Sequence, residues 1–317
     1  MNNESIRVSY GTAIVLGLLK ARQDVPPTTA YLLFDKGCIG NCSFCSRANG
    51  NKESQKLSRI IWPEFSFTTI LEKLTTVPLP FKRVCLQTGF NPQMNDILKE
   101  LVKKLVATGI STSMTLSPSQ TDLALEMLAM GIDHVGIGLD AATEKTYTEH
   151  KRKNWQTDWP SLQTLLYKAG SQIEVHLIFG LGDTEEDFIK RIDAIVAAGG
   201  KVSLFALTPV NGGEAPEISA YRRVQAFRFL CENGVISSQN CRFNDGRLIN
   251  YGITETALVA ALQHGDAFRT SGCGNCNRPY YNERPGQVFY NYPRALSTSE
   301  FAQALSEMGM EMTAELF

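Results

Sequence analysis

The chain has 317 residues, of which 43% are hydrophobic and 20% are charged. This composition supplies enough apolar side chains for a large core and excludes global disorder. The net charge is only -1, so a basic surface for nucleic acid over the whole chain is also excluded. The longest apolar run, 13–19, is too short to span a bilayer and no secretory cleavage site follows it, so we expect a soluble cytoplasmic protein that binds no membrane.

Strand-like and helix-like segments alternate along most of the chain. Strands are predicted at 29–34, 83–87, 111–116, 134–139, 173–179 and 202–207, and helices at 65–76, 94–107, 121–130, 159–168, 184–198 and 220–231. These six βα units predict an α/β fold in which helices cover a parallel sheet. We favour a TIM-type barrel of at least six units, (βα)8-like in plan, because residues suited to chemistry recur just after successive strands.

Three regions are expected: an N-terminal helical segment at 1–28, the barrel at 29–250, and a C-terminal extension at 251–317. Beyond residue 235 the alternation weakens, and 242–249 offers a seventh strand. Within the extension, 278–294 predicts turns and a short hairpin, and 298–308 predicts a final helix.

The chain has eight cysteines, and five of them lie in two tight clusters within loops. Structural disulfides are not expected in a reducing cytoplasm. Cys231 lies in an apolar helical pattern, so a buried free thiol is its simplest interpretation. The two clusters favour metal binding.

The first cluster comprises Cys38, Cys42 and Cys45 in a C-x3-C-x2-C loop directly after the first predicted strand. Three thiolates can each hold one iron of a [4Fe–4S] cluster, which leaves the fourth iron open to a substrate. Gly37 and Gly40 would let the loop wrap closely around such a cluster. A zinc site is the alternative, but it would require a fourth Cys or His nearby, and this loop has none.

This motif, with the aromatic Phe44 just before its last cysteine, resembles the radical S-adenosylmethionine superfamily. The resemblance implies that the open iron binds the amino and carboxylate groups of S-adenosylmethionine. It further implies that one electron from the cluster cleaves the sulfonium and yields a 5′-deoxyadenosyl radical. That radical would abstract hydrogen from an unactivated carbon.

Residues after other predicted strands match positions at which this superfamily contacts S-adenosylmethionine. The resemblance implies the following cofactor-binding residues: Phe44, Gln87, Thr88, Asp140, Gly180, Asp183, Leu207 and Thr208. The match at 87–89 departs from the usual Gly-Gly-Glu of the superfamily. Turns, helix caps and strand ends are the ordinary alternative at each of these positions.

The second cluster combines Cys273 and Cys276, in a C-x2-C knuckle, with Cys85 inside the second predicted strand. An inward-facing Cys85 would point into the barrel, so three thiolates could bind a second, auxiliary iron–sulfur cluster there. The alternative is a structural zinc knuckle completed by Cys241. A thioredoxin-like redox pair fits less well, because no strand–helix junction frames the motif.

The segment 83–92 resembles the second-strand segment of biotin synthase, in which a cysteine ligates the auxiliary cluster. That cluster supplies the sulfur inserted into dethiobiotin. The chain departs from the family where the other auxiliary cysteines are expected, near Ser113 and near His176 or Leu177, and where an Asn-rich substrate motif is expected, at 138–144. The usual [2Fe–2S] site therefore cannot be built.

The C-terminal C-x2-C can replace these losses, because with Cys85 it gives three thiolates for a [4Fe–4S]-type auxiliary cluster. This arrangement resembles the biotin synthase variant of obligate anaerobes. Archaeal-type lipoyl synthases, which insert sulfur into an octanoyl group on a carrier protein, are the nearest rival. A non-catalytic zinc- or cluster-binding scaffold is the alternative from another class.

The resemblance implies a sulfurtransferase of biotin biosynthesis whose small-molecule substrate is dethiobiotin. A flavodoxin or ferredoxin would supply the electron, and the resemblance leaves open whether the chain forms a homodimer. No catalytic acid or base is expected, since a radical cofactor breaks the C–H bond. Arg278, 280–283 and Arg284 could line the substrate pocket or form a solvated hairpin. His176 could be a catalyst, but a core histidine is the commoner case.

Overall fold

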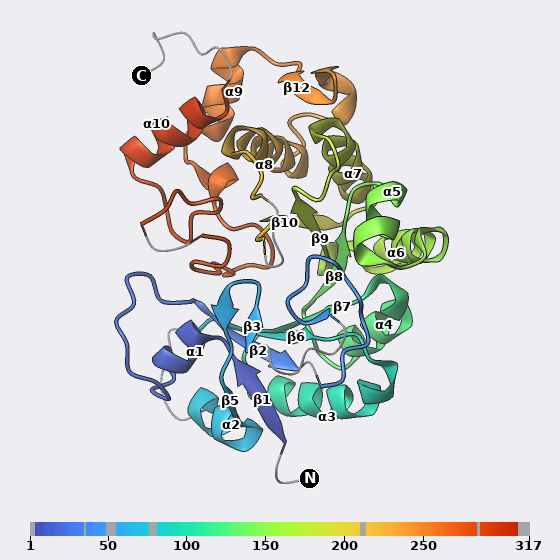
Figure 1. Ribbon diagram of the computed structural model, residues 1–317, viewed down its shortest axis with the longest axis vertical. Helices are drawn as coiled ribbons and strands as arrows, with labels where there is room; N and C mark the ends of the chain where they lie inside the picture. Colours follow the sequence, from blue (N-terminus) through green and yellow to red (C-terminus); the bar gives the residue numbers. More distant parts are fainter. Residues whose placement is uncertain are drawn as a thin grey trace.

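A computed structural model describes residues 4–34, 36–48, 55–75, 81–209, 214–283 and 286–309. Its centre is an eight-stranded sheet with the order β10-β9-β8-β7-β6-β2-β1-β5 (Figure 1). Six consecutive strands of this order are parallel: β2 (Thr29–Phe34), β6 (Arg83–Thr88), β7 (Thr112–Leu116), β8 (His134–Asp140), β9 (Ile173–Phe179) and β10 (Lys201–Ala206). The predicted α/β fold with a parallel, barrel-like sheet is confirmed.

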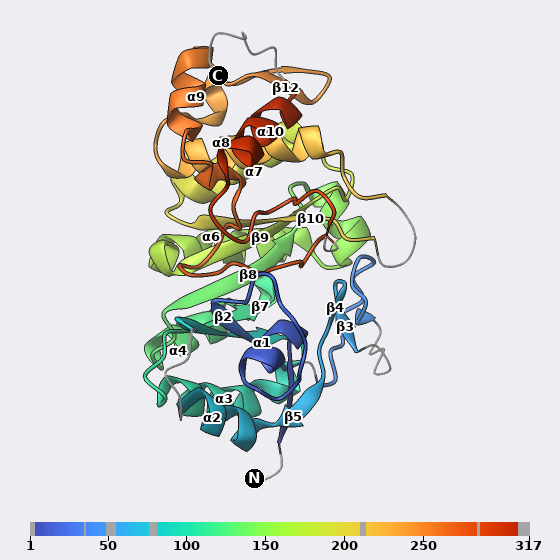
Figure 2. The same cartoon turned by 90° about the vertical axis from the view of Figure 1, so that its left-hand side faces the viewer.

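Helices follow the parallel strands and cover the outer face of the sheet (Figures 1 and 2). They are α2 (Phe67–Thr75), α3 (Asn95–Val106), α4 (Thr121–Ala129), α6 (Trp155–Ala169), α7 (Glu185–Ala197) and α8 (Ile218–Glu232). In α3, Leu98, Leu101, Val102 and Leu105 are buried at the i, i+3, i+4, i+7 spacing of one helix face. Six βα units were predicted, and six are present.

The N-terminal region contains a strand that the sequence analysis missed. β1 (Ser5–Val8) pairs antiparallel with both β2 and β5 (Glu64–Ser66), and α1 (Tyr10–Val15) follows it. Because β1 has only four residues, with alternate ones buried, its pattern is too short to distinguish from a helical turn. The stretch 1–28, expected to be helical, thus contributes a strand to the central sheet.

The prediction that 242–249 forms a seventh strand of the sheet is wrong. The region instead forms a separate hairpin of β11 (Arg242–Asn244) and β12 (Arg247–Asn250). Asp245 and Gly246 connect the two strands, both with positive φ (49° and 74°), as a two-residue hairpin turn requires. This Asp-Gly turn reverses the chain before a strand long enough to join the sheet can form.

The remaining elements are short. They are the hairpin strands β3 (Lys56–Leu57) and β4 (Ile60–Ile61), the helices α5 (Glu144–Thr146), α9 (Glu255–Leu262) and α10 (Thr298–Glu307), the π-helical turn η4 (Tyr147–Lys151), and the 3-10 turns η2 (Pro92–Met94), η3 (Pro118–Gln120), η5 (Gly170–Gln172), η6 (Ser238–Asn240) and η7 (Asp266–Phe268). The predicted final helix is present as α10. Across the part of the chain that the structure describes, no helix combines the length and apolarity of a membrane span.

The C-terminal segment, described over residues 269–283 and 286–296, lies between β10 and the N-terminal elements in both Figure 1 and Figure 2. Its Ser271 hydroxyl accepts the Leu204 N–H of β10 (2.8 Å), and its Asn275 carbonyl accepts the Thr29 hydroxyl of β2 (2.9 Å). β10 and β2 are not neighbours in the sheet, so this segment bridges the side that the strands leave open. Its described residues form turns, with an isolated bridge from Arg269 to Tyr292, rather than the expected hairpin.

Candidate active site

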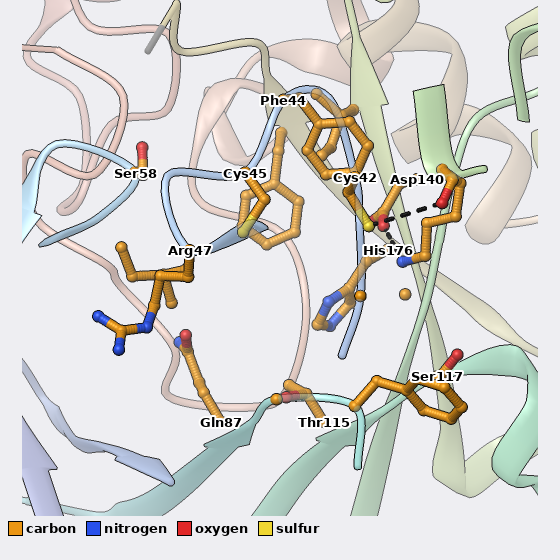
Figure 3. A pocket seen from close by; sticks show the side chains of 18 of the residues that line it. Cys42, Phe44, Cys45, Arg47, Ser58, Gln87, Thr115, Ser117, Asp140 and His176 are labelled. Atoms are coloured by element: carbon orange, nitrogen blue, oxygen red, sulfur yellow. Dashed lines mark hydrogen bonds and ion pairs between the residues drawn. The ribbon is translucent and has the colours of Figure 1, made fainter. Parts of the chain in front are cut away.

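A cavity of about 260 Å³ lies at the carboxyl ends of the parallel strands (Figure 3). Loops after several of these strands line it, as expected for the mouth of a βα barrel. In Figure 3 the side chains of Cys42 and Cys45 lie on one side of the cavity and those of Thr115 and Ser117 on the opposite side. His176 points between them.

The first cysteine cluster reaches this cavity, and Cys38, Cys42 and Cys45 all line it. Gly40 lies between two of the sulfurs: a Cβ there would be 3.5 Å from Cys38 Sγ and 4.0 Å from Cys42 Sγ. A side chain at position 40 would therefore contact both sulfurs. The loop is anchored because the Ser43 N–H donates to the His150 carbonyl (2.9 Å) and the Cys45 N–H to the Cys42 carbonyl (3.2 Å).

The chemistry of this loop fits an iron–sulfur cluster. Burial raises the pKa of the Cys42 thiol, and it raises that of Cys45 to about 11, so the thiolates need a bound cation to be stable. Among the described residues, no group of three His, Cys, Asp or Glu surrounds a point where one ion could bind. Cluster ligands each take a different iron, so their sulfurs need not converge on one point.

Asp140 and Lys151 form an ion pair on the cavity wall, and each side chain is only 11% exposed. Asp140 ends β8 with a φ of 69°, and the pairing register of β8 with β9 shifts just before it. Such a conformation costs about 1–3 kcal/mol for a residue with a side chain, and strain of this kind gathers at functional sites. Burial alone would lower the pKa of Lys151, but Asp140 and Cys42 raise it overall, so the ammonium stays charged.

His176 lies on β9 and lines the cavity, so it is not the purely core histidine that is the commoner case on such a strand. Its ring packs against Phe205 of β10, with 5.3 Å between the ring centroids. It also lies over Gly136 of β8, where a Cβ would approach Nε2 to 2.4 Å. Burial, with Arg278 and Lys151 adding to it, lowers the pKa of His176 to about 3, so the imidazole is neutral at physiological pH.

Six of the eight residues predicted to bind the cofactor line this cavity: Phe44, Gln87, Thr88, Asp140, Leu207 and Thr208. The other two do not. The Asp183 carboxylate accepts the Ala142 N–H (2.9 Å) and the Thr143 hydroxyl (2.6 Å), so it holds the loop after β8. Gly180 has a φ of 112°, and a Cβ there would come within 3.1 Å of Leu207.

The sequence analysis missed several polar residues of the site. Lys153 donates to the Ser117 hydroxyl (2.6 Å) and lies over the Phe90 ring, 3.4 Å from its centroid. Burial, followed by Lys151, lowers the pKa of Lys153 to about 8. The Lys-Arg-Lys run at 151–153 is visible in the sequence, but only the structure shows that Lys151 and Lys153, at and after the end of the turn η4, line the cavity. Arg47, Thr115 and Ser117 also line the cavity and belong to no recognised motif.

The residues after the C-x2-C divide between two cavities. Tyr281 and Asn282 line the first, whereas Arg278, Tyr280 and Tyr281 line a second, described below. The Asn282 amide donates to the Ala206 carbonyl of β10 (2.6 Å). These residues therefore line cavities and do not form a solvated hairpin. Arg284 lies outside the described residues.

The second cysteine cluster lies away from the first cavity, and Cys85, Cys273 and Cys276 do not line it. The C-x2-C loop packs against the amino ends of the strands, because Arg83 Nε, at the start of β6, donates to the Gly274 carbonyl (3.0 Å). The Tyr31 hydroxyl accepts two backbone N–H groups of the loop and lies 3.4 Å from Cys276 Sγ. The loop thus closes the end of the barrel opposite the first cavity.

The three thiols of this second cluster share one buried environment. Burial, followed by Cys276, raises the pKa of Cys85 to about 12. Burial also raises the pKa of Cys273, and Glu174, Cys276 and Cys85 add to that rise. The Cys273 thiol donates to Glu174 Oε2 (3.3 Å), and the other oxygen of this buried carboxylate, Oε1, has no partner among the described residues. The sequence analysis missed Glu174.

Cys241 does not join the second cluster. Its thiol contacts the Ser237 carbonyl (3.8 Å), and Asp193 and Cys231 lie nearby. Cys276 instead packs with Cys85 against a small apolar group of Tyr31, Leu33 and Trp62. The zinc knuckle completed by Cys241 is therefore not formed.

A βα barrel with a three-cysteine loop at its mouth defines a class of cluster-dependent enzymes. The family model of the Radical SAM superfamily matches residues 32–207, more than half of the chain. The chain belongs to this superfamily.

Curated relatives are more specific but only distantly similar. The biotin synthase of Brucella anthropi is 27% identical over 181 residues, which cover 55% of this chain and 51% of the relative. The biotin synthase of Sphingopyxis alaskensis is 23% identical over 199 residues, covering 61% of this chain and 59% of the relative. The chain thus spans only about half to three fifths of the length of these relatives.

Solved structures support the fold. The structure of methylornithine synthase aligns with a TM-score of 0.50 at 14% identity. The alignment covers 90% of this chain and 82% of the methylornithine synthase chain. A maturase of the [FeFe]-hydrogenase has a TM-score of 0.51 at 11% identity, covering 66% of this chain and 51% of its own. At these identities the likeness concerns the fold alone.

Proposed function

We propose that this protein is a sulfur-inserting radical enzyme that converts dethiobiotin to biotin. The observation that carries the proposal is the presence of two separate three-cysteine sets at opposite ends of one barrel. Cys38, Cys42 and Cys45 line the cavity at the carboxyl ends of the strands, and Cys85, Cys273 and Cys276 share a buried site near the amino ends. The similarity to biotin synthases supports the same assignment.

In this proposal the first set holds a [4Fe–4S] cluster that binds S-adenosylmethionine. When bound, the cluster supplies the electron that cleaves this cofactor into a hydrogen-abstracting radical. The six predicted residues on the cavity wall contact the cofactor, and Lys151 holds the Asp140 carboxylate in place to accept a ribose hydroxyl. Gly180 and Asp183 act indirectly, by shaping the loops after β9 and β8.

The second set is proposed to hold a 4Fe-type auxiliary cluster that donates the sulfur. Burial raises the pKa values of the Cys85 and Cys273 thiols, and neighbouring cysteines add to the rise, so bound iron would stabilise thiolates that are otherwise unfavourable there. Glu174 supplies a further anionic donor beside Cys273. A flavodoxin or ferredoxin is proposed as the reductant, and a homodimer as the assembly.

A second candidate function is sulfur insertion into an octanoyl group on a carrier protein, as in lipoyl synthases. The observation that favours it is a second, largely apolar cavity that opens at the surface and ends beside Gln87 of the first. Such a passage suits a chain attached to a larger partner. Zinc or cluster binding without catalysis is the third candidate.

One experiment separates these functions. Anaerobically reconstituted enzyme is given S-adenosylmethionine, a reductant and either dethiobiotin or an octanoyl-lysyl peptide, and products are identified by mass spectrometry. Biotin formation supports the first proposal, and a lipoyl peptide supports the second. Absence of both products, together with zinc in place of iron, would establish the scaffold.

A further inference from the structure

A second cavity, of about 300 Å³, lies beside the first. Its walls come from the N-terminal segment 9–27, the β3–β4 hairpin and residues 278–281 of the C-terminal segment. Gln87 and Tyr281 line both cavities. The second cavity therefore ends at the wall of the proposed cofactor site.

The walls of the second cavity are mainly apolar and aromatic. The residues that give it this character are Tyr10, Ile14, Val25, Ile60, Trp62 and Tyr280. Four charged residues also line it. The side chains of Arg22 and Asp24, which pair at 3.5 Å, are 93% and 63% exposed. Arg59 and Arg278 are only partly exposed, and their guanidinium groups donate to the backbone carbonyls of Tyr280 (3.4 Å) and Ser271 (2.6 Å). Mainly apolar walls with a few charged groups suit an aliphatic chain with a polar attachment, because burial of methylene groups is favourable.

The inner end of this cavity borders the second cysteine set. Tyr31 and Trp62 line the cavity and form the small apolar group against which Cys85 and Cys276 pack. Gln87 follows Cys85 by two residues on β6, so both side chains project from the same face of the sheet. A chain that ends at Gln87 therefore has its end between the two cysteine sets.

One polar group at this location lacks a partner within the described part of the chain. The Trp62 indole N–H is buried and donates to no acceptor. Tyr281 lines both cavities, and its ring packs against Phe205 with 5.7 Å between centroids. A buried donor without an acceptor is unfavourable, and a carbonyl on a bound chain would satisfy the Trp62 indole.

We propose that the second cavity binds the aliphatic acyl chain of the substrate. The chain enters between the N-terminal segment and residues 278–281, and its far carbons lie at Gln87 and Tyr281. This inference rests on the proposed sulfur insertion for its chemistry, but the binding site can be tested alone. Dethiobiotin and an octanoyl-lysine both carry such a chain, and the test distinguishes them.

The test uses two neighbouring residues of β4. Ile60 lines the cavity, whereas Ile61 is 43% exposed and lies outside it, so Ile60→Trp fills the cavity and Ile61→Trp is the matched control. Calorimetry measures binding of N-octanoyl-lysine amide and of dethiobiotin to reconstituted enzyme with S-adenosylmethionine. We expect the Kd of the bound probe to rise at least tenfold in Ile60→Trp and to stay within about twofold of wild type in Ile61→Trp.

A second filling variant, Ile14→Trp, keeps the test decisive if Ile60→Trp is unstable, with folding checked by the cluster absorbance and the Tm. Wild-type affinity in both filling variants would overturn the inference, as would failure of the wild type to bind either probe. Selective binding of one probe identifies the source of the chain. If a probe binds as predicted but no sulfur is inserted, the proposed function fails while the chain-binding site stands.

Discussion

The two cysteine sets differ in how the fold assembles them. Cys38, Cys42 and Cys45 come from one short loop after β2 and line a cavity whose mainly apolar walls also carry charged side chains such as Asp140 and Lys151. Cys85, Cys273 and Cys276 come from a strand and a distant C-terminal loop. The side chains of Arg83 and Thr29 donate hydrogen bonds to backbone carbonyls of that loop and hold it in place. The first site is local in the sequence, whereas the second is assembled by tertiary contacts, and the cysteines of both sets are partly buried.

Under the proposed function the two sets have different roles. The first set, at the cavity, would bind a cofactor that enters and leaves in every reaction. The second set would hold the sulfur donor. Substitutions in each set can separate these roles.

Removing one ligand of the first set should have the largest effect. Cys42→Ala leaves two thiols for the cluster, so we expect S-adenosylmethionine cleavage to fall at least about a hundredfold, since even outer-shell changes cost 10- to 100-fold. Cleavage is measured as 5′-deoxyadenosine release. Cys231→Ala, which removes a thiol packed in α8, is the control and should cleave normally.

Removing one ligand of the second set should separate the two activities. Cys276→Ala should retain cleavage within about twofold of wild type yet form no sulfur-containing product, because the radical still forms but meets no donor. Cleavage and product are quantified in the same reaction. Full product formation by this variant would mean that the second set is structural.

Breaking the ion pair on the cavity wall should weaken cofactor binding without removing the cluster. Lys151→Met leaves the Asp140 carboxylate buried without its cation, so we expect the KM for S-adenosylmethionine to rise about tenfold. The cluster spectrum should not change, and Lys151→Arg should restore most of the affinity. An unaltered KM in Lys151→Met would remove Asp140 from the proposed cofactor contacts.

The smallest effect concerns stability in acid. His176 has a pKa of about 3 in the folded chain and about 6.5 when unfolded, so the unfolded state binds more protons between these values. Stability from this residue is therefore complete above pH 6.5 and decreases as the pH falls, by about 2 kcal/mol between pH 7 and pH 5. Denaturant unfolding should show that His176→Phe loses less stability than the wild type between pH 7 and pH 5. An equal loss in both proteins would mean that the His176 imidazole is exposed to water in the folded chain.

The sequence predicts the local features well. The six βα units and the first cysteine loop depend on patterns within a few residues, such as the buried stripe of α3 and the C-x3-C-x2-C spacing. The grouping of Cys85 with the C-x2-C was predicted from the inward-facing position of Cys85 on a barrel strand, and the family resemblance supported it. Here the structure places the three thiols in one environment.

Other features depend on tertiary contacts that no short pattern records. In the sequence, Glu174 is a single charged residue in an apolar strand. Its contact with the Cys273 thiol, which comes from a distant loop, is visible only in the structure. In the sequence, Lys151 and Lys153 are part of a short run of basic residues. Only the structure shows that both side chains line the cavity. β1 is too short to be recognised without its partners β2 and β5.

The central claim is that two separate iron sites occupy one barrel. It is tested most directly by iron and sulfide analysis, with Mössbauer spectra, of anaerobically reconstituted wild type and of a variant with Cys38, Cys42 and Cys45 changed to Ala. The account predicts about eight irons per chain in the wild type and about four in the variant. A wild type with a single four-iron centre, which the triple substitution abolishes, would contradict it.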